Sequence, residues 1–330
     1  MDTREEIIAV TSSRRDRPLA VVAMGGHAFI QSGEPGTKEV HDRNAAEISA
    51  VLMTLIERDY NVIITHGNGP QVGQLMLQTD LTHDKVPPMP LDILVADTQG
   101  WLGYVLQLAL LNQLRRRNIE RYVVTVVTQV LVDKRDPAFR NPTKPVGHFM
   151  SQEEAEAQRD RLGWNIMEDA GRGWRRVVPS PKPQKVVQRQ MIREAAREGN
   201  IVIAGGGGGI PIIKNSHDDY TGVEAVIDKD LTSSVLAGSV GAELLIILTD
   251  IPQVLVNYRK PNEYPLGAVT LQEAERLYAE GHFAAGSMGP KVEGIINFLK
   301  DGGRRGVVTN ADGLEAAIEG RGGTHFVGGL

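Results

Sequence analysis

Short apolar runs alternate along the chain with longer segments in which apolar residues recur every three or four positions. Runs of the first kind are typical of buried strands, and segments of the second kind are typical of amphipathic helices. The predicted strands are Leu19–Met24, 61–65, 122–128, 200–204, 243–248 and 306–309. The predicted helices are 42–58, 70–78, 91–117, 184–198, 222–238, 271–281 and 290–300. Strands that alternate with helices predict an α/β fold, a three-layer αβα sandwich with a mostly parallel central sheet.

Two stretches depart from this alternation. Residues 1–18 are rich in charge and lack a long apolar core, so we interpret them as an N-terminal extension. Residues 133–183 hold many prolines and charges and do not continue the pattern of the main sheet. We interpret them as an inserted, protruding and lid-like subdomain within a domain that spans residues 19–330.

The composition fits a globular protein and argues against several classes of function. Of the 330 residues, 41% are hydrophobic and 23% are charged, and the net charge is −5. This acidic balance argues against a general role on nucleic acid or at a membrane surface. The chain has no cysteine, which excludes disulfides, thiolate nucleophiles and cysteine metal sites. We find neither a signal peptide nor an apolar run of about 20 residues, so we expect a cytoplasmic enzyme.

Three predicted strands end in glycine clusters, namely Gly25-Gly26, Gly67-Asn68-Gly69 and Gly205–Gly209. Ligands of parallel sheets bind at the carboxyl ends of the strands, so the clusters line one crevice if these ends share an edge. A glycine loop before a helix offers bare N–H groups and a positive helix end to an anion. Simple turns would also use glycine, but three successive clusters favour a phosphate site. No P-loop and no convincing dinucleotide fingerprint is present, so a nucleotide would bind by another design.

Three lysines supply candidate positive charge for such a site. Taken singly, Lys144, Lys229 and Lys291 are ordinary surface residues, but their local settings favour a role in binding. Asp228 and Asp230 flank Lys229 and are placed to orient it by ion pairing. Lys291 follows a Gly-Pro pair at a predicted helix start, where a cation is unfavourable to the helix and therefore suggests another purpose.

Several segments resemble carbamate kinase, of the amino acid kinase superfamily. The motifs are HGNGPQVG (66–73), NPTKP (141–145), VVPSPKP (177–183), AGGGGGIPII (204–213), GVEAVIDKD (222–230), LTDIPQVLVNY (248–258) and GSMGPK (286–291). They are highly specific in combination, and the resemblance runs from about Leu19 to the end. The segment 133–183 looks like the mobile subdomain that distinguishes this family from acetylglutamate kinase.

The resemblance implies reversible phosphoryl transfer between ATP and carbamate, which gives ADP and carbamoyl phosphate with Mg²⁺. In the family this reaction commonly makes ATP at the end of the arginine deiminase pathway. The resemblance also implies a homodimer, for which the long helix 91–117 offers an apolar face. It implies an acceptor-side N-lobe over about 19–200, with the subdomain inserted, and a nucleotide-side C-lobe over about 201–330.

The same resemblance assigns site residues. The implied catalytic residues are Lys144, which reaches the carbamoyl group, Lys229 and Lys291, which neutralise the phosphates, and Asp230, which positions the lysines. The implied acceptor and phosphoryl-binding residues are Gly25, Gly26, His27, Gly67, Asn68, Gly69, Gly206 and Gly207. The implied nucleotide-binding residues are Lys229, Thr249, Asp250, Val254, Tyr258, Met288 and Lys291. Mg²⁺ is expected on the ATP phosphates without protein ligands. Carbamate is already an anion, so positioning and charge stabilisation suffice without a general base.

One position departs from the family, which usually has Gly-Gly-Asn where this chain has Gly25-Gly26-His27. Histidine imitates one function of an asparagine amide, but it is bulkier and titrates near neutral pH. Three interpretations stay open: His27 takes the same role, the acceptor is a different small carboxylate or carbamoyl-like compound, or activity is impaired or the position tolerant. A protein that binds nucleotide or carbamoyl phosphate without turnover is a further alternative, although it would not need all of Lys144, Lys229, Asp230 and Lys291.

Two other groups of residues suggest functions that the sequence disfavours. His27 and His66 resemble a metal pair, but no carboxylate is spaced to complete a zinc site, and we expect His66 to make a structural hydrogen bond. Arg172, Arg175 and Arg176 beside Trp174 suggest nucleic-acid binding. In an acidic chain, however, a solvated or subdomain-packing role is the better interpretation.

Overall fold

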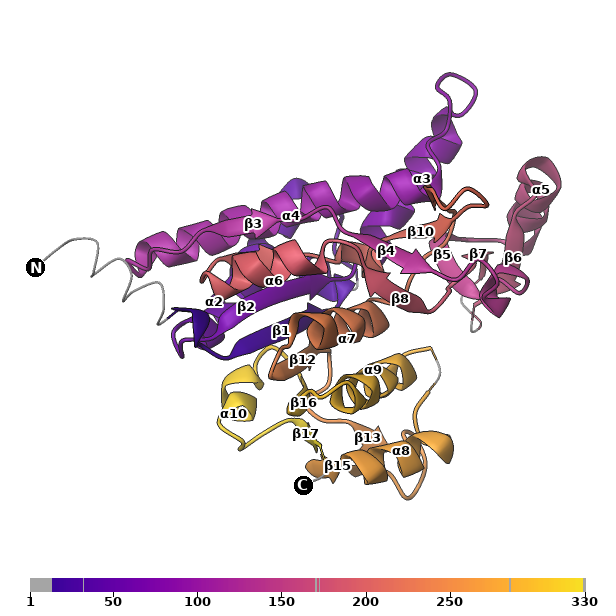
Figure 1. The fold of residues 1–330 in the computed structure, drawn as a ribbon. Helices are drawn as coiled ribbons and strands as arrows, with labels where there is room; N and C mark the ends of the chain where they lie inside the picture. The colour runs from indigo at the N-terminus through magenta and orange to yellow at the C-terminus, as the bar shows by residue number, and fades with distance from the viewer. Residues whose placement is uncertain (1–13, 32, 170, 172, 285, 329–330) are drawn as a thin grey trace, which may run out of the picture.

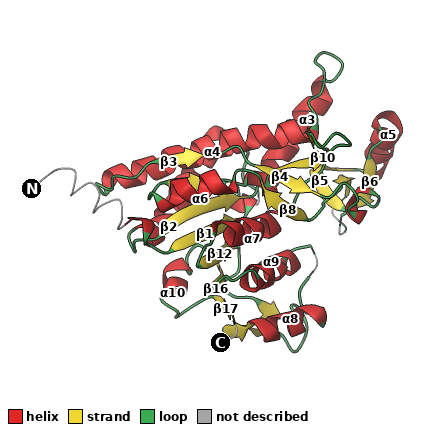
Figure 2. Ribbon diagram, in the orientation of Figure 1, coloured by secondary structure: helices red, strands yellow, loops and turns green. Residues whose placement is uncertain are grey.

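A computed structural model describes residues 14–31, 33–169, 171, 173–284 and 286–328. Its centre is an eight-stranded sheet with the strand order β15-β17-β16-β12-β1-β2-β9-β3 (Figures 1 and 2). The strands are β1 (Leu19–Met24), β2 (Asn61–His66), β3 (Val123–Thr125), β9 (Ile201–Ile203), β12 (Leu244–Leu248), β15 (Ala268–Thr270), β16 (Arg305–Thr309) and β17 (Thr324–Val327). Neighbouring strands are parallel except for the antiparallel pair β16 and β17. The predicted mostly parallel sheet is therefore confirmed.

Helices cover both faces of this sheet. One face carries α2 (Lys38–Ile56), α4 (Leu91–Arg116) and α10 (Leu314–Ile318). The other face carries α6 (Arg189–Arg197), α7 (Lys229–Val240), α8 (Leu271–Ala279) and α9 (Met288–Lys300). Successive side chains of β1 enter alternate cores: Val21 packs with α7 and α9, whereas Val22 packs with α2 and α4. The strand is apolar throughout because both of its faces are buried, and the three-layer αβα sandwich is confirmed.

Two smaller sheets extend the sandwich at one end. One has the order β11-β10-β4-β8, with β4 (Gln129–Val132), β8 (Pro183–Val186), β10 (Ile210–Lys214) and β11 (Tyr220–Gly222). The other has the order β5-β7-β6, with β5 (Lys144–Met150), β6 (Asn165–Glu168) and β7 (Trp174–Val178). Together with α5 (Gln152–Leu162), the second sheet protrudes from the molecule in Figure 1. We call β5, α5, β6 and β7 the subdomain.

The subdomain rests on α3 (Gly69–Thr82). A small core there joins Val72 and Met76 of α3 to Val146 of β5 and Val178 of β7. The backbones come close at Gly73, where an added Cβ would lie 3.2 Å from the Cα of Gly147. The remaining elements are the hairpin strands β13 (Leu255–Val256) and β14 (Tyr264–Pro265) and the 3₁₀ turns η1 (Gly26–Ala28), η2 (Pro137–Phe139) and η3 (Gly206–Gly208).

Several predicted elements have different bounds in the structure, and the following three are shortened most. The predicted helix 184–198 starts only at Arg189, because the residues before it pair with β4 as strand β8. The predicted helix 222–238 starts at Lys229, where the Asp228 side chain caps the helix. The predicted strand 122–128 gives only β3, and β4 follows it in a different sheet. Within the part of the chain that the structure describes, no helix has the length and apolarity to cross a membrane.

Candidate active site

The three glycine clusters meet at one edge of the central sheet. Strands β1, β2 and β9 are parallel neighbours, so their carboxyl ends lie together. A Cβ on Gly67 would lie 2.7 Å from the Gly26 nitrogen, and a Cβ on Gly207 would lie 2.3 Å from Asn68 Nδ2. Real side chains do not approach so closely, so these contacts require glycine. The shared edge predicted from the sequence is confirmed.

The loop at Gly67–Gly69 leads directly into α3 and leaves this helix end open. Asn68 occupies the N-cap position, but its side chain makes no capping hydrogen bond. Its amide instead donates to Thr98 Oγ1 at 2.8 Å. Among the described residues, none beyond its chain neighbours and the backbone of its own helix lies within 4 Å of where a Cβ on Gly69 would be. The first N–H groups of α3 and the positive end of its dipole are therefore a suitable anion site.

The loop at Gly205–Gly209 differs from the expected glycine loop before a helix. It forms the turn η3 and continues into β10, and all five glycines are buried. Gln99 donates to the Gly206 oxygen at 2.9 Å and accepts from the Thr128 nitrogen at 2.7 Å. A Cβ on Gly206 would lie 2.6 Å from the His66 ring. Gly206 and Gly207 thus pack directly against the side chains of His66 and Asn68.

A buried ion-pair cluster lies at the starts of α7 and α9. Asp230 accepts from Lys229 Nζ at 2.7 Å through one oxygen and from Lys291 Nζ at 2.8 Å through the other. The side chain of Asp230 is only 4% exposed. Burial by itself would raise the pKa of Asp230, but the two lysines outweigh it and lower this pKa to about 2. Gly294 allows the close approach of the helices, since a Cβ there would lie 2.9 Å from the backbone carbonyl oxygen of Asp230.

This cluster has an excess of positive charge. Two lysines share one carboxylate, and each lysine lies in the first turn of a helix, where the helix dipole is also positive. Burial lowers the pKa of Lys229, and the nearby Lys291 lowers it further. Ser233 of α7 is bound to Thr65 of β2 at 2.6 Å, which fixes the cluster against the sheet. The arrangement favours a bound anion that carries several charges.

Lys144 reaches the same place from the subdomain. It is the first residue of β5, and its Nζ donates to Asp228 Oδ2 at 3.2 Å across 84 residues of sequence. The other oxygen of Asp228 accepts from the Asp230 nitrogen at 2.9 Å. The sequence predicted both Asp228 and Asp230 as ion-pair partners of Lys229. The pair with Asp230 is confirmed, whereas the Asp228 carboxylate pairs with Lys144 instead.

Of the histidines in the first two loops, His66 is the one whose side chain the structure describes. His66 is buried, and its Nδ1 lies 3.0 Å from the Gly67 oxygen, which is the expected structural hydrogen bond. Burial lowers the pKa of His66 from 6.5 to about 4, and Lys229 contributes to this shift. The ring is therefore neutral at physiological pH. The backbone of His27 lies in η1, and its side chain is outside the described part of the chain.

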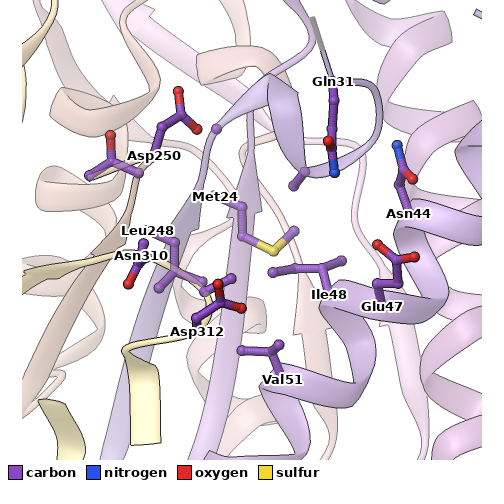
Figure 3. A pocket seen from close by; sticks show the side chains of 14 residues that line it. Met24, Gln31, Asn44, Glu47, Ile48, Val51, Leu248, Asp250, Asn310 and Asp312 are labelled. Carbon is purple, nitrogen blue, oxygen red and sulfur yellow. The ribbon is translucent and has the colours of Figure 1, made fainter. Parts of the chain in front are cut away.

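A cavity of about 560 Å³ opens beside Gly25, between the ends of β1, β12 and β16 (Figure 3). It lies where the strand order reverses, since the chain goes from β1 to β2 on one side and from β12 to β16 on the other. Its lining includes Thr249 and Asp250, two of the expected nucleotide-binding residues. It also includes side chains that the sequence did not indicate, namely Gln31, Asn44, Glu47, Asn310 and Asp312.

The other expected nucleotide-binding residues are spread more widely. Met288 begins α9 close to Lys291 and is partly buried. Tyr258 lies on the hairpin between β13 and β14 with its side chain half exposed, and its ring stacks against the Arg259 guanidinium. Val254 is fully buried in the core. The structure therefore does not bring the side chains of Val254 and Tyr258 to the cavity that Thr249 and Asp250 line.

The carboxylates nearest the lysines are occupied by protein donors. Asp230 is held by two lysines, and Asp228 is held by Lys144 and by backbone N–H groups of α7. Within the described ranges, no group of three or more His, Asp or Glu side chains is arranged to hold a metal ion. These carboxylates do not fit a resident metal site in this arrangement.

Arg175 and Arg176 serve the packing of the subdomain. Arg175 bridges Asp169 at 3.1 Å and the Gly147 oxygen at 2.9 Å. Arg176 stacks over the Trp164 ring and pairs with Glu224 at 3.2 Å. Arg172 is outside the described residues.

Comparison with known proteins agrees with this geometry. The model of the amino acid kinase family matches residues 18–310. The carbamate kinase of Thermococcus kodakarensis is 48% identical over 310 residues, which cover 93% of this chain and 98% of that protein. The carbamate kinase of Trichomonas vaginalis is 45% identical, over 93% of this chain and 98% of that protein. The structure of carbamate kinase from Giardia lamblia bound to AMP-PNP is 39% identical with a TM-score of 0.89, and the match covers 96% of this chain and 100% of that one. The chain belongs to the amino acid kinase family and, within it, to the carbamate kinases.

Proposed function

We propose that this chain is a carbamate kinase that transfers a phosphoryl group reversibly between ATP and carbamate. The observation that carries the proposal is the cluster of Lys229, Asp230 and Lys291 at two helix starts, facing the edge where the glycine loops meet. Relatives that are named carbamate kinase and match nearly the whole chain support it.

Positioning and charge stabilisation account for the chemistry. Carbamate and the nucleotide phosphates are all anions, so the main difficulty is to bring them together in line. Lys229 and Lys291 would neutralise the phosphates, and Asp230 would hold both ammonium groups in place. The backbone of Gly25, Gly26 and Gly67–Gly69 would receive the phosphoryl group in transit. Lys144 would contact the carbamoyl group from the subdomain, and no general base is required.

The nucleotide side of the proposal rests on the ends of β12 and the start of α9. Thr249, Asp250, Met288 and Tyr258 would border the nucleotide, whereas the buried Val254 would only anchor the start of the hairpin in the core. The AMP-PNP complex of the Giardia lamblia relative supports nucleotide binding in this family. Mg²⁺ would arrive on the ATP phosphates, because the nearby carboxylates are already paired. Residues of about 19–200 would form the acceptor side and those of about 201–330 the nucleotide side.

We further propose a cytoplasmic homodimer that makes ATP from carbamoyl phosphate, as at the end of arginine deiminase catabolism. Helix α4 exposes an apolar face on which Ile93, Tyr104 and Leu108 are 42%, 59% and 42% exposed. These residues lie eleven and four positions apart and so share one side of the helix. Sedimentation of the wild type and of Tyr104→Glu tests this contact.

Because His27 stands where the family usually has asparagine, one alternative is a kinase of the same fold that uses another small carboxylate or carbamoyl-like acceptor. The test measures ATP formation from ADP and carbamoyl phosphate with Mg²⁺ for the wild type, for His27→Asn and for a control with the exposed Lys260→Ala. We expect robust turnover by the wild type, with the control unchanged. Activity that appears only in His27→Asn would assign the loop to another acceptor. Nucleotide binding without turnover in either protein would favour a binding protein.

A further inference from the structure

The carboxylate of Asp228 makes two kinds of contact at once. Its Oδ1 accepts from the Asp230 nitrogen at 2.9 Å and from the Leu231 nitrogen at 3.4 Å, and thereby caps α7. Its Oδ2 accepts from Lys144 Nζ at 3.2 Å. The first contact belongs to the sandwich and the second to the subdomain, so this one side chain joins the two parts beside the lysine cluster.

The pair of Lys144 with Asp228 is better protected than the pair of Arg176 with Glu224, which also joins the subdomain to the sandwich. The side chains of Lys144 and Asp228 are 34% and 16% exposed. In the pair of Arg176 with Glu224, the glutamate is 51% exposed. Exposed pairs contribute little because water and salt screen them. The contact of Lys144 with Asp228 is therefore the strongest polar link from the subdomain to α7.

We propose that Asp228 is a positioning residue that holds the Lys144 ammonium group at the phosphoryl-transfer centre and docks the subdomain there. The inference rests on the proposed function, since Lys144 is assigned to the carbamoyl group by that proposal. A lysine on a four-carbon stem has many rotamers, and a fixed carboxylate removes most of that freedom before substrate binds. Asp228 would act through Lys144 without touching the substrate, because its charge would repel an anion.

Two substitutions at Asp228 separate the cap from the ion pair. Asparagine is as good an N-cap as aspartate, so Asp228→Asn keeps the contact with α7 and loses the charge that holds Lys144. We expect kcat to fall about tenfold while KM for ADP changes less than about threefold, with the melting temperature unchanged. Asp228→Ala loses both contacts, so we expect a similar loss of kcat together with a lower melting temperature.

A double-mutant cycle with Lys144→Met tests whether Asp228 acts through Lys144. If it does, Asp228→Asn costs about tenfold in the wild type and almost nothing in Lys144→Met. Equal losses in both backgrounds would overturn the proposal, because they would mean an independent structural effect. Glu224→Gln is the matched control, since it removes another ion pair between the same two parts. We expect it to change kcat by less than about twofold.

A distance measurement tests the docking without any reaction. The chain has no cysteine, so Glu153→Cys on α5 and Gln272→Cys on α8 give one spin-labelled pair. Pulsed electron spin resonance should show one narrow distance distribution, broadened by Asp228→Asn and not by Glu224→Gln. An unchanged distribution in Asp228→Asn, with additive kinetic losses, would overturn the inference. Failure of the wild type to turn over carbamoyl phosphate would reject the proposed function instead, and the distance distributions would still decide whether Asp228 docks the subdomain.

Discussion

Asp228 and Asp230 stand two residues apart at the start of α7, yet they hold their lysines in different ways. Asp230 lies in the sandwich, 4% exposed, and its partners Lys229 and Lys291 are 12% and 16% exposed. Asp228 caps the same helix end and is 16% exposed, and its partner Lys144 arrives from the subdomain with 34% exposure. The first cluster is built from helices that share one core, whereas the second depends on how the subdomain docks. The comparison distinguishes a fixed pair of lysines in the sandwich from a lysine that the subdomain delivers.

The largest effect that we predict is that of Asp230→Asn, which distinguishes Asp230 from Asp228. Asp230→Asn leaves two buried lysines without their shared charge, and loss of one partner of a buried pair typically costs about 3–5 kcal/mol of stability. We also expect carbamoyl phosphate turnover to fall about a thousandfold, because both ammonium groups lose their position. Steady-state kinetics and thermal unfolding followed by circular dichroism measure the two effects.

The control for this prediction is Asp218→Asn. Asp218 pairs with Lys214 through side chains that are 77% and 46% exposed, so its loss should change neither turnover nor stability measurably. A folded Asp230→Asn protein with turnover within tenfold of the wild type would contradict the fixed-cluster interpretation.

Much of this arrangement follows from local sequence. The strand Leu19–Met24 is a continuous apolar run, and both of its faces are buried in the structure. The glycine clusters were located correctly because a strand that ends in glycine needs no knowledge of distant residues. Asn310 and Asp312 were missed, although they follow the predicted strand 306–309 and the rule for carboxyl ends of strands would have included them.

Other features depend on contacts that no local pattern contains. Residues 184–198 have continuous helical character, but pairing of Val186 with Val130 draws the first of them into a strand. The partner of Asp228 comes from 84 residues away, so the neighbouring Lys229 was the natural choice from sequence. Asn44 and Glu47 join the cavity only because α2 packs across the end of β1. In each case tertiary packing overrides the local preference.

A smaller effect is the pH dependence of stability, which tests how completely the sandwich buries His66. His66 has a pKa of about 4 in the folded protein and about 6.5 when unfolded. The unfolded chain therefore binds the extra proton first, so stability is full above pH 6.5 and falls as the pH drops towards 4. Between pH 7.5 and pH 5, His66 should account for about 2 kcal/mol of lost stability. The stabilisation by Asp230, whose pKa is lowered to about 2, is lost in a separate range below 3.8.

Urea unfolding at the two pH values measures this loss for the wild type, for His66→Gln and for the exposed control His217→Gln. We expect the pH dependence to shrink by about 2 kcal/mol in His66→Gln alone. The ring proton resonances of His66 give an independent readout, and titration near pH 6.5 in the folded protein would contradict its burial.

The smallest effects are expected at two glycines that allow a neighbouring backbone to come close, one in the sandwich and one under the subdomain. Gly294 lies in the sandwich, where a Cβ would be 2.9 Å from the backbone carbonyl oxygen of Asp230. Gly73 lies under the subdomain, where a Cβ would be 3.2 Å from the Cα of Gly147. In Gly294→Ala the tightly packed helices cannot separate easily, so we expect a loss of about 1–3 kcal/mol. In Gly73→Ala the subdomain can shift by a few tenths of an ångström, and alanine favours the helix by about 1 kcal/mol. Stability should therefore hold or rise while turnover falls a few-fold, because Lys144 moves with β5. Thermal unfolding and steady-state kinetics on both variants measure these effects. Equal destabilisation by the two substitutions would mean that the subdomain is packed as rigidly as the sandwich. The distinction between fixed lysines in the sandwich and a lysine delivered by the subdomain would then fail.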